Sequence, residues 1–88
     1  MQITYTAQLL KEDGTYVAYA PELDVSSCGD SPDAARHALQ EAVTLFLEEM
    51  QRAGTLHTIL GEAGYREHGG QWEPPEFIGF ERTALAFS

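Results

Sequence analysis

The sequence is poor in positive charge. Lys and Arg together number 5, against 14 Asp and Glu, which gives a formal net charge of −9 at pH 7. A surface that binds nucleic acid needs clustered cations to replace the counterions of the phosphates. The composition therefore argues against a nucleic-acid-binding face, and it predicts attraction to a basic partner.

Cysteine and long apolar runs are also scarce. The one cysteine, Cys28, cannot form an internal disulfide, and no apolar run approaches the ~20 residues that span a bilayer. Nothing in the sequence resembles a signal peptide. These observations predict a single α+β domain over residues 1–88 that acts in the cytoplasm and away from the membrane.

Side chains that support metal or nucleophilic chemistry are few and scattered. His37, His57 and His68 lack the close pair spacing of a metal site, such as H-x₃-H. Cys28 has no histidine near it in the sequence, and we expect it to be a small buried residue at the end of a strand. The sequence predicts no catalytic residue, no metal and no cofactor.

Hydrophobic alternation predicts strands in the first third of the chain. Residues 2–10 alternate between apolar and polar and contain no Asp or Glu. The Asp13-Gly14 pair is a strong hairpin signal, and it leads to a second predicted strand over residues 15–20. A short third strand is expected over residues 24–28.

One long amphipathic helix is predicted after these strands. Ser31 is a suitable N-cap, Pro32 falls at the first helical position, and Gly54 supplies a left-handed stop. Apolar residues recur at three- and four-residue steps, at Ala35, Ala38, Leu39, Ala42, Val43, Phe46, Leu47 and Met50. This stripe needs a cover, so we expect an antiparallel sheet of three to four strands packed on the long helix.

The chain after Gly54 has weaker signals. Apolar spacing predicts a short second helix over residues 56–63, and composition predicts a loop over residues 67–76. Trp72, in that loop, either folds back on the core or serves an interface. Alternation predicts a last strand over residues 80–87, part of which could pack against another subunit.

The central part of the chain resembles a known family. The run from Gly14 to Glu48 is similar to the HicB-like antitoxins, which have a strand ending in Pro-Glu-Leu, then Gly-Asp-Ser/Thr, then a helix rich in Glu-Ala. The matching positions are Tyr16, Pro21, Glu22, Leu23, Gly29, Asp30, Ser31, Ala35, Glu41 and Ala42. Ala34 departs from the pattern, since the family often has Glu there, and the chain beyond Gly54 does not match.

The resemblance implies a partial RNase-H-like β-β-β-α-β fold and a function. Such antitoxins bind and neutralise a small basic RNA-cleaving toxin, HicA, and many continue into a C-terminal DNA-binding domain. The residues that follow the match here are neither basic nor numerous enough for one, so direct DNA contact is not expected. Two alternatives remain open: an orphan homo-oligomeric scaffold of the same fold, and, more weakly, a small metal-dependent nuclease.

Four residues are the predicted partner contacts. Glu22, Asp24 and Asp30 surround the strand–helix turn and carry negative charge, and Trp72 offers a large aromatic surface. A HicA-like toxin is the expected partner. We also expect a homo-oligomer, either a dimer or a tetramer, because small sheets leave open edges that proteins pair or cover.

Overall fold

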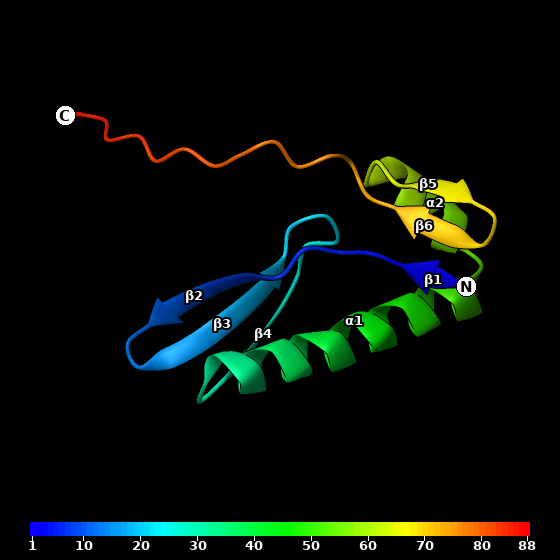
Figure 1. The fold of residues 1–88 in the computed structure, drawn as a ribbon, viewed down its shortest axis with the longest axis horizontal. Helices are drawn as coiled ribbons and strands as arrows, with labels where there is room; N and C mark the ends of the chain where they lie inside the picture. The colour runs from blue at the N-terminus through cyan, green and yellow to red at the C-terminus, as the bar shows by residue number, and fades with distance from the viewer.

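The computed structural model describes residues 1–88 and has two three-stranded sheets and two helices (Figure 1). The elements in chain order are β1 (Gln2–Ile3), β2 (Gln8–Glu12), β3 (Thr15–Ala20), β4 (Val25–Gly29), α1 (Pro32–Ala53), α2 (Leu56–Glu62), β5 (Arg66–His68) and β6 (Gln71–Glu73). The predicted α+β fold, with a sheet packed on one long helix and a short second helix, is confirmed.

The larger sheet is antiparallel, with strand order β2-β3-β4. Asp13 and Gly14 connect β2 to β3 with φ angles of +48° and +82°, and positive φ at both central residues is what a tight type I′ hairpin requires. The hairpin prediction is confirmed. The single strand expected over residues 2–10 is divided instead, because β1 pairs in parallel with β6 while β2 pairs with β3.

Helix α1 begins and ends where the capping residues predict. The Ser31 hydroxyl accepts a hydrogen bond from the Ala34 amide at 3.0 Å, Pro32 opens the helix, and Gly54 closes it with φ +76°. The helix packs on β3 and β4 and also contacts α2, and its buried residues are Ala35, Leu39, Val43 and Met50. Gly29 permits this approach, since a Cβ there would lie 2.8 Å from the backbone of Ala34.

A smaller unit forms around α2. Residues 67–76, expected to be a loop, contain most of the β5–β6 hairpin, which turns at Gly69 and Gly70 with φ angles of +55° and +83°. The sequence does not predict this hairpin, because its two strands have only three residues each. The two glycines between them and the two prolines after them give the segment the composition of a loop. Strand β6 also pairs with β1, so the smaller sheet joins the N-terminal segment to residues 71–73.

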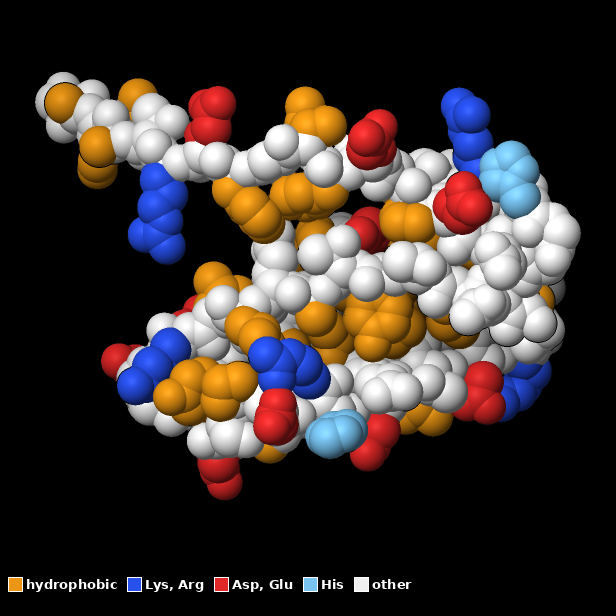
Figure 2. Space-filling model, in the orientation of Figure 1, with side chains coloured by type: hydrophobic (Ala, Val, Ile, Leu, Met, Phe, Trp, Pro, Cys, Tyr) orange, Lys and Arg blue, Asp and Glu red, His pale blue; other side chains and the backbone are white.

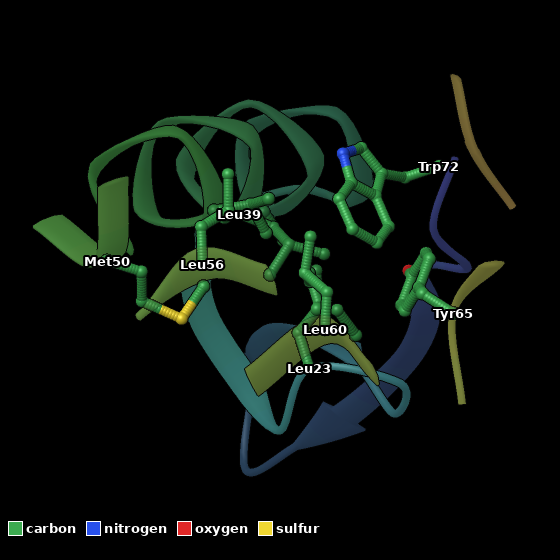
Figure 3. Close-up of a cluster of buried hydrophobic side chains, with 11 residues drawn as sticks. Leu23, Leu39, Met50, Leu56, Leu60, Tyr65 and Trp72 are labelled. Atoms are coloured by element: carbon green, nitrogen blue, oxygen red, sulfur yellow. The ribbon is translucent and has the colours of Figure 1, made fainter. Parts of the chain in front are cut away.

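The two units share one hydrophobic core. Its 11 buried residues are Ala18, Ala20, Leu23, Ala35, Leu39, Val43, Met50, Leu56, Leu60, Tyr65 and Trp72. Figure 3 shows Trp72 and Tyr65 pointing inward beside Leu60 from the smaller unit, while Leu23 and Leu39 come from the larger one. The α1 stripe is therefore covered by both the sheet and the smaller unit.

The strand expected over residues 80–87 is not formed. No residue after Glu73 makes a backbone–backbone hydrogen bond, and residues 77–88, called the tail below, run away from the smaller unit and along the larger one without pairing with it (Figure 1). Alternation predicts a strand there, but the tail pairs with no other strand of the chain. No helix in the structure has both the length and the apolar character needed to cross a membrane.

Candidate functional site

The surface of the chain is dominated by carboxylates without cationic neighbours. Three of the 14 acidic side chains lie within ion-pair distance of a basic group, namely Asp33 with Arg36, Glu49 with Arg52, and Glu67 with His57 at 3.7 Å. The other 11 have no such partner. The combined electrostatic field of these carboxylates would attract a basic protein before contact.

Glu22 holds the N-terminal segment in place. Its carboxylate accepts hydrogen bonds from the Thr6 amide, at 3.0 and 3.1 Å, and from the Thr6 hydroxyl at 2.6 Å. Thr6 lies in the link between β1 and β2, so this contact fixes the point where the chain passes from one sheet to the other. Glu22 is half-buried and already bonded within the chain, which leaves little of it for a partner.

Asp24 and Asp30 are exposed and lie at opposite ends of β4. Asp24 has a left-handed backbone, with φ +55°, and its carboxylate accepts a hydrogen bond of 2.9 Å from the Tyr19 hydroxyl. Asp30 precedes the helix cap and has no ion pair. The five residues of β4 lie between the two acids, and six steps of ~3.3 Å along an extended chain place them roughly 20 Å apart. The structure therefore spreads them along one edge of the sheet and does not gather them into one pocket.

Trp72 lies in the core, 4% exposed, on strand β6. Its ring meets the His57 ring edge-on, with centroids 5.0 Å apart, and its indole N–H has no hydrogen-bond partner. Of the two alternatives that the sequence left open, burial favours the core. A side chain so enclosed offers little surface to a partner, so its burial speaks against the predicted partner contact at Trp72.

Tyr65 ties the smaller unit to the same N-terminal link. Its hydroxyl donates a hydrogen bond of 2.8 Å to the Thr4 carbonyl. Burial raises the pKa of this hydroxyl above its ordinary value of 10.0, and the negative charge of Glu22 raises it further. The Tyr19 hydroxyl also has a raised pKa, chiefly because it donates to Asp24.

We expect alkaline pH to destabilise the fold through Tyr65. A raised pKa means that the folded state prefers the neutral hydroxyl, so the stabilisation is complete below pH 10 and is lost as the pH rises beyond it. Tyr65→Phe should cost about 1 kcal/mol at neutral pH, for one lost hydrogen bond, and should flatten the alkaline decline. Urea unfolding from pH 7 to 11 measures both effects. If the stability of the variant fell as steeply with rising pH as that of the wild type, Tyr65 would not be the group responsible.

The remaining chemistry-bearing residues are dispersed. Cys28 is exposed, so its predicted burial is wrong: β4 places it on the sheet face opposite α1, where no helix packs. No three His, Cys, Asp or Glu side chains come together as potential metal ligands. His37 and Glu41 line a shallow depression of about 480 Å³ on the solvent face of α1, together with Gln40, Thr44 and Leu45.

An apolar surface that the sequence analysis did not single out lies between β2 and the tail. Leu9 and Leu10 of β2 are 39% and 46% exposed. A groove of about 460 Å³ separates this strand from the tail and is lined by Thr6, Ala7, Gln8, Leu9, Leu10, Phe80 and Arg82. Figure 2 shows the hollow with apolar side chains on both walls. The signal for this surface in the sequence is the alternation of apolar and polar residues in both β2 and the tail.

Comparison with known proteins found no match: no family model fits the chain, and no significant similarity appeared among curated sequences or solved structures.

Proposed function

We propose that this chain is a HicB-like antitoxin, a cytoplasmic binding protein without enzymatic activity that neutralises a small basic RNA-cleaving toxin by direct contact. The observation that carries the proposal is the unneutralised acidic surface, in which 11 of 14 carboxylates lack a basic partner. The resemblance of residues 14–48 to that family supplies the identity of the partner class, a HicA-like toxin.

The edge formed by Asp24, β4 and Asp30 is the proposed contact surface. Both acids are exposed, and neither is paired with a cation. The Tyr19 hydroxyl holds the Asp24 carboxylate in one position, so part of the ordering cost of binding is met before the partner arrives. A toxin whose cationic RNA-binding surface meets this edge would be blocked from its substrate.

The test is co-purification with the small basic protein encoded by the neighbouring open reading frame. We expect a complex at low ionic strength that weakens steeply as salt is added. Removing both charges with Asp24→Asn and Asp30→Asn should weaken binding about tenfold, which is the effect of losing two exposed charge contacts. Isothermal titration at two salt concentrations measures the change.

The matched control is a pair of exposed acids elsewhere. Glu48→Gln with Glu62→Gln removes the same charge from α1 and α2, away from β4, and should change affinity less than threefold. Equal weakening by both pairs would show that only total charge matters and would remove the β4 edge from the proposal. Absence of any complex with either neighbouring gene product at low salt would contradict the antitoxin function itself.

The alternative of a homo-oligomeric scaffold has its own supporting observation, the exposed apolar tail. It predicts self-association and no toxic neighbour. Self-association is also compatible with toxin binding.

A further inference from the structure

We propose that the tail of one copy adds as a strand to the exposed edge of β2 in a second copy, and that the exchange is reciprocal, so that the protein is a strand-exchanged dimer. The tail is residues 77–88, and the acceptor is the β2 edge over residues 6–10. This inference does not depend on toxin binding.

The tail has the character of a strand that lacks its neighbour. It is extended and makes no backbone–backbone hydrogen bond. Its large apolar residues are in solvent, with exposed fractions of 94% for Ile78, 71% for Phe80, 82% for Leu85 and 95% for Phe87. The last prolines are Pro74 and Pro75, so every tail residue can donate to a ladder. Contiguous exposed apolar surface of this kind marks an interaction site.

The β2 edge is the acceptor that matches it. An edge strand presents unpaired N–H and C=O groups, and β2 adds two exposed leucines to them. The other edge of the same sheet, β4, carries Ser26 and Ser27 and is bounded by Asp24 and Asp30. An apolar tail gains more at β2 than beside those carboxylates.

The direction of the strands favours a second copy over the chain's own tail. Tail and β2 run the same way in Figure 1, with the groove between them. The tail could therefore join its own β2 only as a parallel strand. A two-fold axis perpendicular to β2 brings the partner's tail in antiparallel, which is the slightly more stable pairing for short strands.

The charge distribution permits two copies to meet at this surface. The segment over residues 2–10 contains no charge, and the tail contains one Glu and one Arg, so the whole formal charge of −9 lies between Lys11 and Glu76. Repulsion between copies therefore acts mainly elsewhere. A basic partner would find no attraction on the tail, whereas a second copy supplies both the strand and the edge.

The exposed area is large enough for a stable dimer. The chain exposes 6638 Å². A compact monomer of this mass exposes about 5,100 Å². The excess of about 1,500 Å² is greater than the roughly 800 Å² that each partner buries in a standard interface. The radius of gyration, 15.1 Å, likewise exceeds the ~12 Å of a compact domain of this length.

Sedimentation equilibrium of the full chain is the first measurement, and we expect a species of twice the 9.7 kDa chain mass at micromolar concentration.

The double variant Thr83→Pro, Ala84→Pro removes two consecutive backbone N–H donors from the tail, one of which must face the acceptor strand. It should raise the dimer Kd about 100-fold. Thr83→Ser with Ala84→Ser retains both donors and should leave the Kd unchanged within threefold. Neither site makes contacts in the monomer that folding requires, which a circular dichroism melt at low concentration checks.

Hydrogen exchange then locates the contact. Amides of the tail and of β2 should become protected together as the concentration rises through the dimer transition. A monomer at all concentrations would overturn the proposal, and so would a dimer that the proline pair leaves intact. Tail protection that is independent of concentration would show that the tail docks on its own chain, and that result would also overturn it.

Discussion

Trp72→Ala is expected to destabilise the fold by about 3–5 kcal/mol, the largest effect of any single substitution considered for this chain. Trp72 is 4% exposed, and it connects β6 to the core that α1 and α2 share. Removing the indole leaves a cavity at the junction of the two units. Because small domains are only marginally stable, the variant should be partly unfolded at 37 °C. Guanidinium unfolding followed by circular dichroism measures the loss.

Trp72→Phe is the matched comparison, and it should cost much less, about 1–2 kcal/mol. Phenylalanine keeps most of the apolar volume and removes the indole N–H, which is buried without a hydrogen-bond partner. A phenylalanine variant as unstable as the alanine variant would mean that the N–H is bonded in solution. An alanine variant of wild-type stability would show that Trp72 is not part of the core.

Glu22→Ala is expected to cost about 2–3 kcal/mol. The Glu22 carboxylate accepts three hydrogen bonds from two donors, the Thr6 amide and hydroxyl, and hydrogen bonds to charged acceptors are the stronger ones. Their loss frees the link between β1 and β2, so the amides of β1 should also exchange faster with solvent. Urea unfolding and hydrogen exchange measure the two effects.

Asp30→Ala provides the comparison for Glu22, since it removes the same charge from a side chain that makes no hydrogen bond in the chain. It should change stability by less than about 0.5 kcal/mol. If Glu22→Ala also stayed within that limit, and instead weakened partner binding, Glu22 would be a contact residue and not a positioning one.

Local chemistry was sufficient to predict the larger unit. The caps at Ser31 and Gly54 and the turn at Asp13-Gly14 are short-range signals, and the structure has all three where they were expected. The smaller sheet was not predicted because its pairing is long-range: β1 reaches β6 across most of the chain, and neither strand has enough residues to show a period.

The sequence predicted the surroundings of the four proposed contact residues less well than the fold. Composition located exposed acids at Asp24 and Asp30, but it could not show that Glu22 is bonded to Thr6 or that Trp72 is enclosed. Both facts come from residues far apart in sequence. The alternation of apolar and polar residues predicts a strand in the tail, but it does not indicate which chain supplies the neighbouring strand.

The parallel pairing of β1 with β6 has a consequence for synthesis. Ile3 lies opposite Trp72, so β1 is synthesised well before the strand that it pairs with. The β2–β3–β4 sheet can form earlier with α1 packed on it, since these four elements all lie within the first 53 residues. We expect β1 to stay accessible to proteases and chaperones until β6 has been synthesised, and closure of the smaller sheet to follow assembly of the larger unit.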